Sequence, residues 1–271
     1  MAERAGTEEG RLAGGLPYLR LGSGPDLVLL DGFNPCNGNP TGLARRSILL
    51  LLRALAESST VWLVNRRPGV PEGVSMADLA AEHATALADR FGAPVDVLGV
   101  STGGSVGLQL AAAHPTVVRR LVITGAAHRV GDLGRRIMVR VAELHERGES
   151  RAAHREHVRM SAASPWRQLL LGDLQWLVEP LVFGRGIDRS DLVRTLRAEA
   201  VFDLGPRLGA ITAPTLVVTG DQDLVCPPDL VTETVEGVRD GRLLVYKGRG
   251  HGEALIDRRF AQDVRVFLTA A

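Results

Sequence analysis

The chain has 271 residues, of which 45% are hydrophobic, and this is enough apolar material for one large α/β domain with an insertion. The 32 Lys and Arg residues nearly balance the 31 Asp and Glu residues, without blocks of like sign. This balance argues against a nucleic acid or an anionic membrane as partner, and it favours a small molecule or a protein.

The N-terminus and the cysteines indicate the compartment. No apolar stretch is long enough to span a bilayer, and residues 1–15 carry charges where a secretion signal would be apolar. The two cysteines, Cys36 and Cys226, are too few for a disulfide scaffold and lack the spacing of a metal site. We therefore expect a cytoplasmic protein with reduced thiols and no bound metal. The sequence does not indicate its oligomeric state.

Apolar runs alternate with helical patterns in the first part of the chain, which is typical of a mostly parallel sheet flanked by helices. The predicted strands are short, β-branched runs at 27–30, 61–64, 95–100 and 121–124. One helix is predicted near 47–57, where four consecutive leucines indicate a helix wedged into the core. Another is predicted over 76–91, because Ser75 and Asp78 form a capping box at its start.

The pattern changes over 126–206, where strand signals vanish and amphipathic helical segments take over. Apolar residues share one helical face at 137–144 and again at 192–196, and the stretch between them is rich in tryptophan and leucine. We interpret this segment as an inserted helical cap, which either covers a pocket as a lid or packs against the body.

The alternation resumes after the insertion, so the predicted core consists of 1–125 and 207–271. Strands are expected at 215–218 and 243–246, and helices near 228–235 and 258–268.

The segment Gly99-Val100-Ser101-Thr102-Gly103 matches G-x-S-x-G between a predicted strand and a helix-compatible stretch at 104–114. On such a turn the serine hydroxyl is pushed out of the sheet, and glycines fit where strand and helix nearly touch. The N–H groups at the start of the helix suit a developing oxyanion. The pattern predicts a nucleophile elbow, although a strand-to-helix joint whose serine only caps the helix would look the same.

An activated serine needs a base and a group that orients the base, and two later loops offer both. Asp221 and Asp223 follow the strand at 215–218, and His251 follows the strand at 243–246. Both loops lie past the C-terminal ends of strands, the edge at which open parallel sheets build their sites. The chain order Ser101, Asp223, His251 is the order expected for this elbow.

Over nearly its whole length the sequence resembles the α/β-hydrolase superfamily, and within it the branch of esterases and non-haem haloperoxidases. The matching segments are LVLLDGF at 27–33, GVSTGG at 99–104, APTLVVTGDQD at 213–223 and GRGHG at 248–252. The resemblance implies the α/β-hydrolase fold. It also implies Ser101 as nucleophile, His251 as general base and acid, and Asp223, rather than Asp221, as the orienting carboxylate.

The resemblance further implies an oxyanion hole made by the backbone N–H groups of Phe33 and Thr102. Two nearby segments depart from the family pattern. Asp31 stands where members commonly carry a histidine before the glycine, so the hydrogen bonds of that histidine must be replaced. At 65–69 the chain reads Asn-Arg-Arg-Pro-Gly, where an aspartate followed by a Gly-rich turn is more usual.

Further pocket residues are expected on the same edge and in the insertion. Asn34 lies in the loop after the strand at 27–30, and His128 lies just past the strand at 121–124. Trp166 and Trp176, with the leucines at 169–171, are expected to pack over the Ser101 edge. Cys36 and Cys226 are interpreted as pocket-wall or loop residues. Of the remaining histidines, His114 is expected to cap a helix end. The other four are expected to be solvated: His83, His145, His154 and His157.

Together these residues predict a serine hydrolase that cleaves a small, largely apolar ester or related acyl compound through an acyl-enzyme, with no cofactor. The alternatives on the same fold are cofactor-free perhydrolysis and hydrolysis of a carbon–carbon bond. Ser101 argues against the dehalogenase and epoxide hydrolase branches, which need a carboxylate at the elbow. The alternative of another class is a ligand-binding protein that keeps the fold without turnover.

Overall fold

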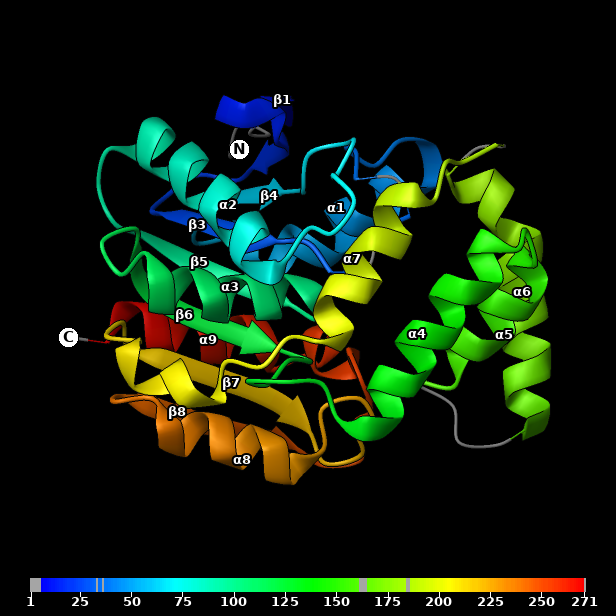
Figure 1. The fold of residues 1–271 in the computed structure, drawn as a ribbon. Coiled ribbons are helices and arrows are strands. Elements are labelled where there is room, and N and C mark those ends of the chain that lie inside the picture. The colour runs from blue at the N-terminus through cyan, green and yellow to red at the C-terminus, as the bar shows by residue number, and fades with distance from the viewer. Residues whose placement is uncertain (1–5, 33, 36, 161–164, 184–185, 271) are drawn as a thin grey trace.

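A central sheet with helices on both faces forms the body of the protein in the computed structural model, which describes residues 6–32, 34–35, 37–160, 165–183 and 186–270 (Figure 1). The strand order is β1-β2-β4-β3-β5-β6-β7-β8. Strands β3 to β8 are parallel, whereas β1 and β2 run antiparallel to their neighbours. The strands are β1 Glu8–Arg11, β2 Pro17–Leu21, β3 Asp26–Leu30, β4 Thr60–Val64, β5 Val95–Val100, β6 Val118–Thr124, β7 Thr215–Gly220 and β8 Gly241–Tyr246.

Helices cover both faces of this sheet, and a further group lies beyond its carboxyl edge (Figure 1). Helices α2, α3 and α8 pack on one face and contribute to the larger hydrophobic cluster, while α1 and α9 pack on the other. The α/β fold class is thereby confirmed. The helices are α1 Gly42–Ala56, α2 Met76–Phe91, α3 Thr102–Ala113, α4 Asp132–Glu146, α5 Ser150–Val158, α6 Pro165–Phe183, α7 Ser190–Ala200, α8 Pro228–Gly237 and α9 Phe260–Thr269.

Each element predicted from periodicity overlaps an observed element of the same type, and α2 has the predicted bounds. The helices predicted at 47–57 and 258–268 extend one residue past the end of α1 and two residues before the start of α9. Its capping box is present, because the Asp78 N–H donates to the Ser75 hydroxyl oxygen and the Ser75 N–H donates to the Asp78 carboxylate. The leucine run in α1 is only partly in the core. Leu52 is fully buried but Leu50 is 70% exposed, because consecutive residues of a helix point about 100° apart and cannot all face the sheet.

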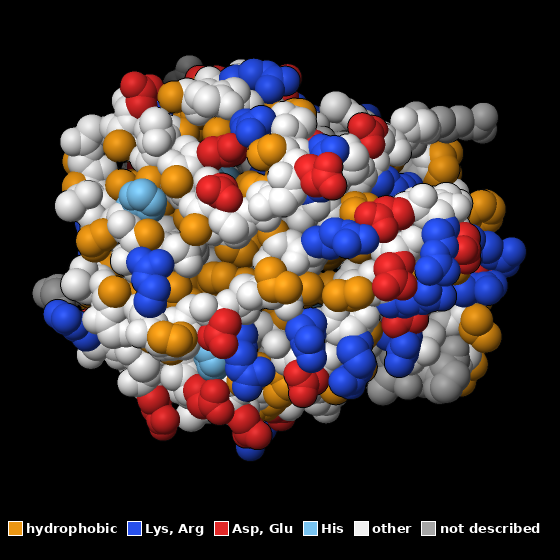
Figure 2. All heavy atoms as spheres, in the orientation of Figure 1, with side chains coloured by type: hydrophobic (Ala, Val, Ile, Leu, Met, Phe, Trp, Pro, Cys, Tyr) orange, Lys and Arg blue, Asp and Glu red, His pale blue; other side chains and the backbone are white. Residues whose placement is uncertain are grey.

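Helices α4 to α7 come from the segment between β6 and β7, as expected for an insertion. The segment leaves and rejoins the body at one place, where Arg129 and Asp203 form an isolated antiparallel bridge. On the face seen in Figure 2, basic and acidic side chains are interspersed over this part of the molecule. Within the part of the chain that the structure describes, no helix is both long and apolar enough to cross a membrane.

His83 is buried inside α2, so the expectation that it is solvated is wrong. Its Nδ1 lies 2.7 Å from the carbonyl oxygen of Leu79, and burial lowers the pKa of the imidazole to about 4. The charges around it in the sequence occupy the outer face of the helix, whereas His83 shares the inner face with Leu79 and Leu87.

Candidate active site

Ser101 lies on the turn between β5 and α3, at the carboxyl edge of the sheet. Its backbone has φ 50° and ψ −120°, a conformation that residues other than glycine adopt only where their surroundings enforce it. The Ser101 N–H donates to the Thr124 carbonyl oxygen at 2.9 Å. Gly103 allows the close crossing, since a Cβ there would lie 2.1 Å from the carbonyl oxygen of Leu30.

The loops after β7 and β8 bring an imidazole and a carboxylate to this serine. The Oγ of Ser101 lies 3.1 Å from Nε2 of His251, and Nδ1 of His251 lies 3.0 Å from Oδ2 of Asp223. Asp223 is buried and also accepts the N–H groups of Val225 and Cys226, which fix the carboxylate. A proton on Nδ1 donated to this carboxylate leaves the Nε2 lone pair facing the serine hydroxyl.

Asp221 has a different environment from Asp223, although only one residue separates them. Its carboxylate is exposed and accepts the N–H of Gly248 at 2.6 Å. It therefore ties the turn after β7 to the turn after β8, as expected for a turn residue.

The residues expected to form an oxyanion hole can be placed in part. No described residue accepts a hydrogen bond from the Thr102 N–H, at the start of α3. Phe33 lies outside the described residues. Its neighbour Gly32 lies beside the nucleophile, since a Cβ on Gly32 would be 3.4 Å from the Cβ of Ser101.

Arg66 holds the loop after β3 in place through hydrogen bonds, a role that was not predicted from the sequence. Its guanidinium donates to the carbonyl oxygens of Asp31 at 2.9 Å and Gly32 at 2.7 Å. The Asp31 carboxylate in turn accepts the Gly32 N–H and the Asn34 amide. Arg66, Asp31 and Asn34 thus form a hydrogen-bonded network around the loop after β3.

The Arg66 side chain is buried, so its charge is costly unless opposite charges and acceptors surround it. Burial lowers its pKa, and the carboxylates of Asp31, Glu199 and Asp191 act in the opposite direction. The odd Asn-Arg-Arg-Pro-Gly segment at 65–69 was the available signal for this residue. The sequence alone could not show what its side chain contacts.

Two cavities lie against the loop that follows β3 and share Val182 and Phe183 of α6 as wall residues. Ser101, Asp223 and His251 are not among the wall residues of either cavity. The first has a volume of about 310 Å³, contains Asp31 and Asn34, and is otherwise mostly apolar, with walls from α1. The second has a volume of about 220 Å³ and is lined by both polar and apolar side chains, mostly of α4, α5 and α6. Asn34 thus lines a cavity, as expected.

The second cavity is lined by three histidines and by a charged pair from the insertion. Glu179 is paired with Arg189 and lies 3.2 Å from Nε2 of His154. Burial lowers the pKa values of His145 and His157 to about 4, and for His145 the nearby Arg189 adds to this. The expectation that these three histidines are solvated is wrong, because they face inward from α4 and α5 toward α6.

Trp166 and Trp176 do not pack over the Ser101 edge as expected. They are 64% and 40% exposed and line neither cavity. Apolar residues surround α6 on all sides, so the sequence did not show which face turns inward. The inward face carries Gln175, Val178 and Val182, at helical spacing.

His128 and Cys226 also lie apart from the cavities. The His128 ring is buried against α8, with its Nδ1 3.0 Å from the Thr234 hydroxyl oxygen. The Cys226 thiol is buried and free, and its backbone N–H binds Asp223. His114 lies at the C-terminal end of α3, as expected. Cys36 lies outside the described residues.

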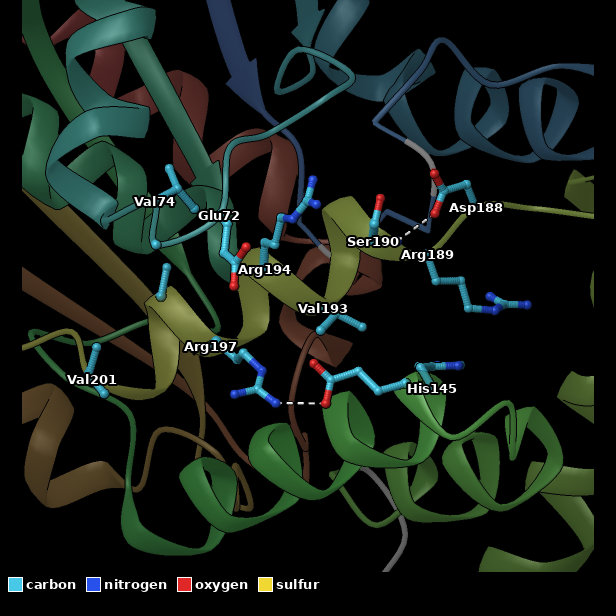
Figure 3. A pocket seen from close by; sticks show the side chains of 13 residues that line it. Glu72, Val74, His145, Asp188, Arg189, Ser190, Val193, Arg194, Arg197 and Val201 are labelled. Carbon is cyan, nitrogen blue, oxygen red and sulfur yellow. Dashed lines mark hydrogen bonds and ion pairs between the residues drawn. The ribbon is translucent and has the colours of Figure 1, made fainter.

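A surface groove of about 870 Å³ lies on the outer side of α7 (Figure 3). Val193, Arg194 and Arg197 project into it, and Arg197 is paired with Glu146. Neither the residues Ser101, Asp223 and His251 nor the loop after β3 contributes to its walls, so this groove is set apart from the candidate active site. Among the described residues, no cluster of three or more His, Cys, Asp or Glu side chains could hold a metal ion.

A parallel sheet covered on both faces, with a serine on a strained turn after β5, defines an α/β-hydrolase. A family model named Hydrolase_4 and described as serine aminopeptidase, S33, matches residues 72–257, and the chain belongs to this family. The protein is a hydrolase.

Two named relatives are each 30% identical to this chain. A protein of Serratia proteamaculans named carbamate hydrolase RutD aligns over 192 residues, which are 69% of this chain and 70% of its own length. The pimeloyl-acyl-carrier-protein methyl ester esterase of Neisseria meningitidis aligns over 185 residues, which are 64% of this chain and 68% of its own length.

Solved structures share the fold at lower identity. The α/β hydrolase MGS-M2, from a deep-sea metagenome library, superimposes with a TM-score of 0.77 at 17% identity, covering 95% of this chain and 96% of its own. The enol-lactonase of Burkholderia xenovorans LB400 superimposes with a TM-score of 0.73 at 20% identity, covering 97% of this chain and 100% of its own.

Proposed function

We propose that the protein is a serine esterase that cleaves a small, largely apolar carboxylic ester through an acyl-enzyme. The observation that carries this proposal is the hydrogen-bonded series Ser101, His251, Asp223, with Ser101 held at φ 50°. A serine that only caps a helix needs neither the imidazole nor the buried carboxylate behind it.

The geometry supports a two-step reaction. His251 Nε2 takes the proton from Ser101 Oγ as the oxygen attacks the ester carbonyl carbon, and Asp223 stabilises the imidazolium. The Thr102 N–H, which has no acceptor within the described part of the chain, donates to the oxyanion. The imidazolium then protonates the departing alkoxide, and water, activated by the same imidazole, hydrolyses the acyl-enzyme.

The cavities against the loop after β3 support an apolar substrate of limited size. The cavity beside Asn34 has about 310 Å³, which suits a short acyl or alkyl group, and its walls are mostly the apolar side chains of α1 and α6. We propose that the segment 126–206 acts as a cap that sets substrate choice, through Val182 and Phe183. The names of the two curated relatives, one for a carbamate and one for a methyl ester, are consistent with acyl transfer.

The test is covalent labelling with a fluorophosphonate probe, together with turnover of chromogenic esters of increasing acyl length. The wild-type protein should be labelled and should prefer short acyl chains. Ser101→Ala should abolish labelling and turnover while circular dichroism stays unchanged, since it removes one oxygen. A wild-type protein that is neither labelled nor active would instead support a ligand-binding role. Labelling that persists in the variant would place the nucleophile elsewhere.

A further inference from the structure

Glu199 is a buried carboxylate that comes from the inserted segment and reaches the start of the elbow helix. It lies on the inner side of α7 and is 2% exposed, whereas Arg194 and Arg197 project from the outer side into the groove of Figure 3. A carboxylate in such a place is stable only when donors occupy its oxygens. Burial accordingly raises its pKa, against the effect of those donors.

Both oxygens of Glu199 are bound by hydroxyl groups from the first turn of α3. Thr102 Oγ1 donates to Oε2 at 2.6 Å, and Ser105 Oγ donates to Oε1 at 2.8 Å. The Ser105 N–H also donates to the Ser101 carbonyl oxygen at 3.2 Å. Glu199 therefore binds Thr102, which directly follows the nucleophile, and Ser105, whose N–H closes the turn around it.

Opposite charges lie on the two sides of this turn. Arg66 holds the loop before Phe33, Glu199 holds Thr102, and the two buried charges attract each other. The attraction offsets part of the cost of burying each group. A strained residue such as Ser101 persists only where its surroundings restrict it, and Glu199 restricts its C-terminal neighbour.

We propose that Glu199 is a positioning residue of the esterase reaction, which fixes Thr102, and with it the N–H that faces the oxyanion, through a hydrogen bond from the inserted segment. This inference rests on the proposed function. It makes the cap part of the catalytic apparatus as well as part of the pocket wall, because α7 carries the group that aligns the elbow.

The test compares Glu199→Gln with Asp191→Asn on a minimal acetate ester. Asp191 is the matched control, because it is a second buried carboxylate of α7 whose partners, the N–H groups of Gly69 and Val70, are not part of the elbow. Both variants should lower the melting temperature. Only E199Q should lower kcat, by about tenfold, which is the rate equivalent of one hydrogen bond, with KM little changed.

A second variant tests the same contact from the other side. Thr102→Val keeps the shape and the backbone N–H but removes the hydroxyl, so it should lower kcat like E199Q. The double variant should lose little more than either single one, since E199Q removes the charge from the same contact whose hydroxyl donor T102V removes. Equal kcat losses in E199Q and D191N, or unchanged kcat in E199Q and T102V, would overturn the inference while wild-type labelling still supports the esterase. An unlabelled wild type would overturn both.

Discussion

The Arg66 guanidinium donates a 2.7 Å hydrogen bond to the carbonyl oxygen of Gly32, the residue directly before the expected oxyanion donor Phe33. A second bond, to the Asp31 carbonyl, makes the support bidentate. A buried cation therefore fixes the direction in which the Gly32 carbonyl group points.

Replacing Arg66 should impair catalysis more than substrate binding. Arg66→Met removes both hydrogen bonds and leaves two buried carbonyl groups without donors, which costs about 1–3 kcal/mol of stability each. The loop then loses its alignment, so kcat should fall at least about tenfold while KM for a short ester changes little. Arg67→Met is the control, because the neighbouring Arg67 binds Glu82 at a half-buried position away from the loop. Equal kinetics in the two variants would contradict this role.

The two acids after β7 should differ sharply in their effect on turnover. Asp223→Asn should lower kcat by orders of magnitude, because an amide favours the wrong imidazole tautomer and does not stabilise the imidazolium. Asp221→Asn keeps an acceptor for the Gly248 N–H and should stay within about tenfold of the wild type. Both are measured on one chromogenic ester. A greater loss at Asp221 would assign the orienting carboxylate to that residue.

Acyl-length preference should depend on the inward face of α6. Val182→Ala shortens a side chain that lines both cavities and so enlarges them. The preference should therefore shift toward longer acyl chains, with little change in the rate on an acetate ester. Leu181→Ala, one residue away, alters a side chain that is 72% exposed and should leave the acyl-length profile as it is. The measurement is kcat/KM across a series of ester lengths. A uniform loss on every ester in V182A would indicate a structural role only.

The stability of the fold should fall as the pH decreases from about 6.5 to about 4. Burial holds the pKa of His83 at about 4 in the folded state, below the ordinary histidine value of about 6.5 in the unfolded chain. Between these values the unfolded chain binds a proton that the folded state does not. The free energy of unfolding therefore decreases by up to about 1.4 kcal/mol per pH unit for this group. His83→Gln should give a shallower slope in urea titrations at several pH values. Parallel slopes would show that another group dominates.

Much of this architecture could be predicted because the parallel strands are continuous apolar runs and the helices between them have an amphipathic pattern, with a capping box at the start of α2. Strand β1 could not be predicted, since its four residues, Glu8–Arg11, are mostly exposed and polar. It is a strand only because β2 lies beside it. The meeting of Ser101, Asp223 and His251 was expected from the strand ends.

Contacts that depend on the packing of side chains from distant segments were missed. Glu199 is an ordinary charged residue in the sequence, and nothing in its local pattern distinguishes it from a solvated one. Arg66 stands in the unusual segment 65–69, but the segment does not show what its side chain contacts. Trp166 and Trp176 were misplaced for the converse reason, because bulk and apolarity do not tell which side of α6 faces inward.

The bonds between α7 and the loop after β4 have a consequence for how substrate enters. Asp191 accepts two N–H groups of that loop, and Arg194 donates to the Val70 carbonyl oxygen. With Glu199 added, α7 is anchored to the body along its whole length, whereas α5 and α6 pack on each other and α6 meets the body at α1. A movement of the insertion that opened the cavities to substrate would therefore have to involve α5 and α6 and leave α7 in place.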